Sequence, residues 1–260
     1  DDHNPSCTVW EVLLRPAKRV RTGSVLMFHE HGRGKILDRM TEKKWLLELT
    51  TDFPWETFLE NHGSTPLPPY IDRKDDTTHR STDRERYQTV YARRFGSVAA
   101  PTAGLHFTPD ILHRLEMMDI NIAKVTLHVG YGTFLPVEAE NVEDHAMEEE
   151  YYEISAEMAA IISGSKRVVA VGTTSTRVLE SLADERGRIA AASGYTKLFI
   201  YPGYRFKRVN ALLTNFHLPK SSLYLLTCAF GCPDLIRTAY AEAIRERYRF
   251  YSYGDCMFIS

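Results

Sequence analysis

The sequence predicts a mixed α/β fold, in which a larger α/β domain carries an attached smaller β-barrel-like domain. Short apolar runs separated by turn residues fill about the first 65 positions, which is typical of a unit built from strands. After that point strand-like runs alternate with helical patterns, as in α/β domains. We therefore expect residues 1–65 to form the β-barrel-like domain and residues 66–260 to form the α/β domain, with an exposed connector near residues 72–86.

The first region contains three strand-like runs and several glycines that can form the turns between them. The runs are Val9–Leu14, Val25–Phe28 and Trp45–Leu49, and the glycines are Gly23, Gly32 and Gly34. Pro66 and Pro68 then end the pattern, and the polar segment Asp72–Arg86 follows.

The α/β region opens with a strong helix signal. Thr108 can cap a helix, Pro109 suits the first helical position and Asp110 complements the helix dipole. The run Ile122–Val129 then alternates as a strand should, which places His128 on the side opposite to the apolar residues.

A second helix is expected from Ser155 to Gly164, followed by a buried strand at Val168–Val171. That strand leads through Gly172 into another helix, and a further strand is expected at Leu198–Tyr201. These elements predict a βαβ unit.

The last part of the chain repeats the strand-to-helix pattern. An apolar strand is expected at Ala211–Phe216, with a turn at Pro219–Ser222 that starts two helices. The second of these helices should run from about Asp234 to Tyr248, and the final strand should lie near Cys256–Ile259.

Composition narrows the function classes. The 260 residues are 43% hydrophobic, which is enough for a sizeable core, and no apolar run reaches the length of a bilayer span. The chain does not open as a secretion signal would, so we expect a cytoplasmic protein. The four cysteines have no CxxC spacing, which favours reduced, buried thiols and no metal site.

The formal charge of −2 does not by itself indicate a nucleic-acid-binding protein. Charged residues are nevertheless clustered, both basic ones near the start, after Tyr204 and before the C-terminus, and acidic ones around Glu148–Glu150. Taken alone, such clusters are best interpreted as solvated surface charge.

Two strand-to-helix turns can hold a ligand, because helix N-termini present unpaired N–H groups. The turn Gly172–Arg177 has four hydroxyls and a guanidinium, which suit a phosphate, a carboxylate or ribose hydroxyls; a capped helix with a surface arginine explains it equally well. The turn Thr214–Ser221 gathers an amide, an imidazole and an ammonium. The segments Gly96–Thr108 and Leu127–Phe134 allow close backbone approach, although packing or an ordinary hairpin also accounts for them.

Several long strings in these segments carry a family resemblance. They include GSVAAPTAGLHFT (residues 96–108), LHVGYGTF (127–134), VGTTSTRVLES (171–181), LLTNFHLPKSSL (212–223) and YRFYSYGD (248–255). In this order they resemble the S-adenosylmethionine:tRNA ribosyltransferase-isomerase family of queuosine biosynthesis. Two departures stand out: the family has an additional N-terminal segment, so the N-terminal part of the first domain is expected to be missing, and Glu148 stands where a second histidine is common.

The resemblance implies that the ribosyl part of S-adenosylmethionine is transferred to the aminomethyl arm of 7-aminomethyl-7-deazaguanine at the wobble position of a tRNA anticodon. The ribose is rearranged to give epoxyqueuosine, while adenine and methionine leave. S-adenosylmethionine is thus the cosubstrate and tRNA the partner, with no metal, no membrane and no obligate protein partner implied. A base near neutral pKa and a donor for adenine are required.

The resemblance also suggests site residues. The expected catalytic residues are His106, His128, His217 and Asp255. The expected cosubstrate-binding residues are Thr102, Gly104, Gly130, Thr173, Thr174, Ser175, Arg177 and Asn215. The expected RNA-binding residues are Tyr131, Phe134, Arg205, Lys207, Lys220, Arg247 and Tyr253.

Two other functions stay open at this point. The chain can be a noncatalytic RNA-binding fragment, in which case it would not release adenine. It can also be another nucleoside-binding enzyme on the same scaffold, in which case the deazaguanine arm on tRNA would not be required.

Overall fold

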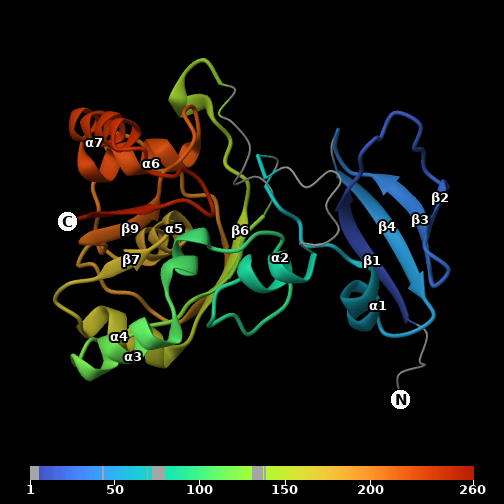
Figure 1. Cartoon of the computed structure of the whole chain (residues 1–260), viewed down its shortest axis with the longest axis horizontal. Helices are drawn as coiled ribbons and strands as arrows, with labels where there is room; N and C mark the ends of the chain where they lie inside the picture. Colours follow the sequence, from blue (N-terminus) through green and yellow to red (C-terminus); the bar gives the residue numbers. More distant parts are fainter. Residues whose placement is uncertain (1–5, 43, 69, 72–79, 131–136, 138) are drawn as a thin grey trace. The chain divides into compact units, whose positions relative to one another are not determined.

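The computed structural model describes residues 6–42, 44–68, 70, 71, 80–130, 137 and 139–260. The chain divides into two compact units, Asp1–Thr65 and Pro66–Ser260. Figure 1 shows the sheet of the first unit and the helices and strands of the second.

Within its described residues, the first unit is a four-stranded antiparallel sheet with one helix. Its strands are β1 (Ser6–Leu13), β2 (Val25–Phe28), β3 (Gly32–Arg39) and β4 (Lys44–Thr51), in the order β1-β4-β3-β2. The helix is α1 (Trp55–His62). Among the described strands β1 and β2 are the edges, so the sheet is open and closure into a barrel is not confirmed.

Alternation along β4 builds the core of this unit. Trp45, Leu47 and Leu49 point to the buried face, where they pack with Ile36 of β3 and Phe58 of α1. Because buried and less buried residues alternate along β4, only one face of the sheet has to be covered. The amphipathic helix α1 packs side chains against that face.

The described residues of the second unit form two three-stranded sheets beside its helices, which confirms the mixed α/β class. The first sheet holds β7 (Val169–Val171), β9 (Ala211–Asn215) and β10 (Cys256–Ile259), in the order β10-β9-β7. Strands β7 and β9 are parallel, and β10 is antiparallel to β9. The second sheet is antiparallel and holds β5 (Thr126–His128), β6 (Glu150–Ile154) and β8 (Ala192–Thr196), in the order β5-β6-β8.

Two strand predictions need correction. Leu198–Tyr201 belongs to no strand, and the parallel partner of β7 is β9. The strand that precedes this segment is β8, whose Ser193 and Gly194 have weak strand propensity but pair with β6. The run Ile122–Val129 forms a strand only at β5, because pairing with β6 ends after three residues.

Three helices of the second unit begin at residues whose side chains cap them. Thr108 accepts a hydrogen bond from the Ile111 N–H at the start of α3, and Ser155 and Ser221 cap α4 and α6 in the same way. The helices are α2 (Arg80–Arg86), α3 (Pro109–Met117), α4 (Ala156–Gly164), α5 (Thr173–Leu182), α6 (Ser222–Gly231) and α7 (Pro233–Arg245), with 3-10 helices η2 (Thr102–His106) and η4 (Val142–Asp144).

Helices α2 and α7 differ from expectation. Helix α2 occupies part of the connector expected to be exposed, and its Asp83 is buried. The remaining connector residues, 72–79, lie outside the described residues. Helix α7 ends at Arg245, three residues before the predicted end, because Arg247 takes a positive φ of 59°.

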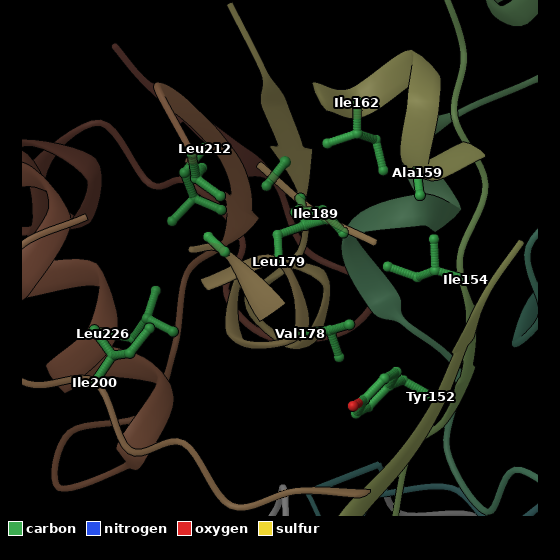
Figure 2. Close-up of a cluster of buried hydrophobic side chains, with 13 residues drawn as sticks. Tyr152, Ile154, Ala159, Ile162, Val178, Leu179, Ile189, Ile200, Leu212 and Leu226 are labelled. Atoms are coloured by element: carbon green, nitrogen blue, oxygen red, sulfur yellow. The ribbon is translucent and has the colours of Figure 1, made fainter. Parts of the chain in front are cut away.

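The main core of the second unit lies around α5. Val178 and Leu179 lie between Leu212 and Leu226 on one side and the β6 residues on the other (Figure 2). Helix α5 is thereby packed against both sheets, so its N-terminus is held in a fixed place at the end of β7.

The cysteines are all free, and their burial is mixed. Cys228 is buried in α6, whereas Cys7 and Cys232 are exposed, so the expectation of buried thiols is wrong for these two. Within the described part of the chain, no helix has both the length and the apolar character that a membrane span requires.

Candidate active site

The carboxyl ends of the parallel strands β7 and β9 meet at one edge of their sheet, where α/β proteins usually bind ligands. A recess opens there between the start of α5, η2 and the start of α6. Its lining is mainly small and hydroxyl-bearing, with a few aromatic rings. The lining residues are Tyr70, Ala100, Pro101, Thr102, Ala103, Val129, Val171, Gly172, Thr173, Thr174, Ser175, Thr214, Asn215, Phe216, His217, Leu218, Ser221, Leu223, Tyr251 and Ser252.

Gly172 shapes the turn that enters α5. Its φ of 91° favours glycine, and its N–H donates to the Leu213 carbonyl at 2.9 Å. No side chain of the described residues caps α5, so the first N–H groups of the helix are available beside the hydroxyls of Thr173, Thr174 and Ser175. This end of the recess can hold an anion or hydroxyl groups.

Asn215 connects two of the expected site residues across the end of β9. The Thr102 hydroxyl donates to Asn215 Oδ1 at 2.9 Å, and Asn215 Nδ2 lies 3.0 Å from His106 Nε2. Because the amide nitrogen donates, the His106 Nε2 must accept, which places the imidazole proton on Nδ1. Residues far apart in the sequence are thus joined into one hydrogen-bonded chain.

His106 is half-buried at the end of that chain. Burial lowers the pKa of its imidazole below the ordinary value of 6.5; the Asp255 carboxylate raises that pKa and Arg249 lowers it. Asp255 accepts from the Arg249 guanidinium at 3.0 Å, and this bond lowers the pKa of its carboxyl. His106 is therefore mainly neutral at pH 7, and, like Asp255 and Arg249, it is not itself among the described residues that line the recess.

His217 is a buried, neutral histidine in the recess wall. Its Nε2 lies 2.7 Å from the Thr214 hydroxyl, and its backbone N–H donates to the Tyr240 hydroxyl at 2.9 Å. Burial lowers the pKa of the imidazole to about 4. A general base works best when its pKa is near the working pH, so this histidine is better suited to hydrogen bonding than to proton abstraction.

Arg177 does not reach the recess. Its guanidinium forms a buried ion pair with Glu150 of β6, and its Nε donates to the Leu198 carbonyl at 2.7 Å. The interpretation of Glu150 as solvated surface charge is wrong, because its side chain is only 4% exposed. Arg177 therefore ties α5 to β6, whereas Thr173, Thr174 and Ser175 line the recess.

His128 also lies outside the recess lining. Its ring packs edge-on against Tyr151 with centroids 5.2 Å apart, and a Cβ built on Gly96 would fall 2.4 Å from its Cε1. The neighbouring Val129 does line the recess. The structure thus places His128 on an adjacent surface rather than among the residues that contact the cavity.

The two glycines expected to approach the cosubstrate have different surroundings. Gly104 is buried, and a Cβ at this position would lie 2.1 Å from the Tyr91 hydroxyl. A Cβ built on Gly130 would have no atom of the described residues within 4 Å, so these residues leave room for a side chain at this position. Neither glycine is among the described residues that line the recess.

The four basic residues expected to contact RNA, Arg205, Lys207, Lys220 and Arg247, are exposed. Lys220 lies nearest to the recess in sequence, directly before the lining residue Ser221. Lys207 is partly engaged, because its ammonium pairs with Glu185 at 2.9 Å.

Among the aromatic residues expected at the RNA surface, Tyr253 lies within the described part of the chain. Tyr253 is half-buried, with its hydroxyl 3.4 Å from Asp83 and the Arg86 guanidinium 5.5 Å from its ring centroid. Tyr131 and Phe134 lie outside the described residues.

Sequence reasoning missed Glu150, Glu180 and the tyrosines of the recess wall. Glu180 is buried and accepts hydrogen bonds from the backbone N–H groups of Lys207, Arg208 and Val209. An acidic residue in the interior of an amphipathic helix is a weak signal, because the same residue type usually lies on the solvated face.

Among the described residues, no group of three or more His, Cys, Asp or Glu side chains is arranged to hold a metal ion.

Comparisons with known proteins agree on one family. The family model described as "Queuosine biosynthesis protein" matches residues 2–259. A curated S-adenosylmethionine:tRNA ribosyltransferase-isomerase of Syntrophus aciditrophicus is 59% identical over 250 residues, which cover 96% of this chain and 69% of the relative. The protein of the same name from Trichlorobacter lovleyi is 47% identical over 254 residues, covering 96% of this chain and 73% of the relative.

A solved structure adds to these sequence relatives. The crystal structure of an S-adenosylmethionine tRNA ribosyltransferase from Thermotoga maritima superimposes with a TM-score of 0.51 at 30% identity. The match covers 97% of this chain and 70% of the other one.

Proposed function

The chain belongs to the queuosine biosynthesis protein family, and we propose that its recess is where the ribosyl part of S-adenosylmethionine is transferred to a tRNA base. The enzyme is a tRNA ribosyltransferase-isomerase that uses S-adenosylmethionine as a substrate. The unit Pro66–Ser260 carries every described residue that lines the recess, so we assign the chemistry to this unit.

The reaction sets three demands on the site. The sulfonium makes the C5′ hydrogens of S-adenosylmethionine acidic, so a base must reach them. Adenine must receive a proton as it leaves, and water must be kept away from the intermediates while the ribose is rearranged to the epoxide of epoxyqueuosine. The products besides the modified tRNA are adenine and methionine.

One observation carries the assignment of roles: Asn215 holds both Thr102 and His106 at the end of β9. This contact leaves the proton of the neutral imidazole on Nδ1 and places His106 beside Asn215 of the recess lining, although His106 itself is not among the described lining residues. We assign proton handling to His106, and its positioning to Asn215 and Thr102. Asp255 sets the charge around the imidazole rather than contacting the recess.

The start of α5 is the proposed polar anchor of the cosubstrate. The hydroxyls of Thr173, Thr174 and Ser175 and the uncapped N–H groups suit the methionine carboxylate or the ribose hydroxyls. Arg177 supports this end through Glu150 instead of contacting the cosubstrate. His217 lines the recess as a neutral hydrogen-bonding group.

The tRNA is proposed to enter with 7-aminomethyl-7-deazaguanine at the wobble position of its anticodon. An unpaired loop base can be turned out of its stack and held by aromatic rings and basic side chains. The exposed residues Arg205, Lys220 and Arg247 are the proposed contacts to the phosphates. A tRNA substrate also favours a cytoplasmic site of action.

Adenine release is the test of the proposed function. The chain is mixed with S-adenosylmethionine and an anticodon stem-loop that carries the deazaguanine arm, and adenine is quantified by chromatography. We expect release only when both substrates are present, and none with a stem-loop that carries unmodified guanine. Tight RNA binding without adenine release would instead support a noncatalytic RNA-binding role.

A further inference from the structure

We propose that Tyr70 and Tyr251 form an aromatic wall of the recess that stacks on a purine-type ring. The inference rests on the proposed function, and it gives a role to two residues that are not among the expected site residues. Both side chains line the recess, together with Ser252 between Tyr251 and Tyr253. The purine-type ring belongs either to the adenine of S-adenosylmethionine or to the deazaguanine of the tRNA.

The two rings hold each other in place. Their centroids lie 4.7 Å apart at an interplanar angle of 35°. The Tyr70 hydroxyl shares a 2.6 Å hydrogen bond with the buried Ser252 hydroxyl, which fixes the far end of the ring. Both tyrosines are half-buried and both line the recess.

The backbone of Tyr251 is held in an unusual conformation. Its φ is 74°, in the left-handed region that residues other than glycine rarely adopt. Its N–H donates to the Phe216 carbonyl at 3.1 Å, and its own carbonyl accepts from Gly254 at 3.1 Å. Such conformations persist where surrounding contacts impose them, and they gather at ligand sites.

The first of these contacts ties the ring to the site. Phe216 stands between Asn215 and His217, and all three line the recess. The position of Tyr251 is therefore set by the same strand end that carries the hydrogen bond to His106. A ring placed in this way can orient a base relative to the group that moves the proton.

A flat heteroaromatic ring fits the chemistry of this wall. Base-on-aromatic stacking uses the ring face and leaves the polar edges of the base free for hydrogen bonds. The same recess also contains polar groups that can form hydrogen bonds, namely the hydroxyls at the start of α5 and the amide of Asn215. The methionine and ribose parts of the cosubstrate suit the hydroxyl end, whereas a base suits the tyrosines.

The test measures binding of each purine source by ring-removal variants. Tyr251→Gly suits the positive φ, because glycine adopts it freely, and Tyr70→Leu removes the second ring. Tyr251→Phe keeps the ring and removes only the hydroxyl. Tyr195→Leu is the control, because Tyr195 is 66% exposed on β8 and does not line the recess.

S-adenosylmethionine without RNA is titrated by calorimetry, and the modified stem-loop is titrated by fluorescence anisotropy. We expect Tyr251→Gly and Tyr70→Leu to weaken one of these ligands by roughly tenfold, while Tyr251→Phe and Tyr195→Leu bind like the parent. Loss confined to S-adenosylmethionine assigns the wall to adenine, and loss confined to the stem-loop assigns it to the deazaguanine. Folding of every variant is checked by circular dichroism.

Binding of both ligands within about twofold of the parent by Tyr251→Gly and Tyr70→Leu would overturn the wall. A loss of affinity in Tyr251→Phe as large as that in Tyr251→Gly would also overturn the wall, because the hydroxyl and not the ring would then make the contact. If Tyr251→Gly does not fold, Tyr70→Leu decides alone. Adenine release by the parent separates the two proposals: release with normal binding by the variants keeps the function and rejects the wall, whereas the expected binding losses without release keep the wall and reject the function.

Discussion

The guanidinium of Arg177 and the carboxylate of Glu150 form an ion pair in which each side chain is only 4% exposed. Burial lowers the pKa of Arg177, and Glu150 opposes that change. Arg177 lies in α5 and Glu150 begins β6, so the pair joins the helix whose N-terminus lines the recess to the second sheet. A charge buried in this way depends on its partner, because neither group has water to replace it.

Removing one partner of this pair should therefore be costly. We expect Glu150→Ala to lower the free energy of unfolding by about 3–5 kcal/mol, because the Arg177 charge stays buried without its partner. The neighbouring Glu149 is the matched control, because its pair with Lys197 is at the surface. Glu149→Ala should cost less than about 1 kcal/mol. Urea unfolding measures both values, and equal losses in the two variants would contradict the structural role.

Gly104 and Gly130 should respond differently to alanine. The added methyl at Gly104 would meet the Tyr91 hydroxyl and Thr89 Cγ2, so we expect Gly104→Ala to destabilise the fold by about 1–3 kcal/mol through overpacking. The methyl of Gly130→Ala meets no atom of the described residues within 4 Å and should leave stability unchanged or slightly raised. Thermal unfolding compares the variants. A tolerated Gly104→Ala would show that Tyr91 moves aside freely.

The sequence predicts those elements that local signals determine. The cap at Thr108 and the helix start at Ser155 follow from residue type and spacing, and Ser221, which caps α6, lies in the predicted turn Pro219–Ser222. The parallel partner of β7 is not predicted correctly, because the apolar run after β8 looks like a strand, whereas pairing is decided by contacts with β6.

The candidate site follows the same division. Asn215 and the α5 hydroxyls lie together because the ends of β9 and β7 meet at one edge of a sheet, which is a rule that sequence can use, whereas Thr102 reaches them from η2. Arg177 is predicted to contact the ligand because it lies near the start of the helix. The sequence does not show that Glu150 is its partner. Tyr251 lies in the matched string at residues 248–255, but nothing local indicates a positive φ at this tyrosine.

Metal removal should leave turnover unchanged. The four cysteines have no paired ligand spacing, and the sulfonium supplies a good leaving group without a Lewis acid. We expect the same rate of adenine release before and after treatment with a chelator selective for zinc and iron, with magnesium kept constant so that the RNA stays folded. A stoichiometric metal that is lost together with activity would refute this expectation.

His217 should make stability depend on pH. Its pKa is about 4 in the folded chain, against the ordinary value of 6.5 that applies to the unfolded chain, so the unfolded chain binds more protons between these values. The free energy of unfolding should thus reach its full value above pH 6.5 and decrease as the pH drops toward 4. The contribution of His217 to this decrease is about 3 kcal/mol.

Urea unfolding at several pH values tests this dependence. His217→Gln should lose the part of the slope between pH 6.5 and 4 that this histidine contributes. His113→Gln is the control, because His113 is exposed on α3. Identical slopes in the parent and in His217→Gln would mean that the imidazole is not buried as the structure shows.

His106 should control how the reaction rate depends on pH. Its pKa lies below 6.5 because of burial, and the neutral imidazole is the form that can accept a proton. Single-turnover adenine release should then be constant above pH 6.5 and decline below it, as the imidazole becomes protonated. His106→Gln should lower the rate by roughly 10²–10⁴-fold, the usual loss for a positioned acid or base.

The two charged neighbours of His106 should move this decline in opposite directions. Asp255 raises the pKa of His106, so Asp255→Asn should lower it and shift the decline to a more acidic pH. Arg249 lowers that pKa, so Arg249→Gln should shift the decline toward neutral pH. Asn141→Ala, which removes an exposed amide outside the recess lining, should change neither the rate nor its pH dependence. If both charge variants keep the parental profile, the titrating group is not His106, and the proton must be handled by a different residue.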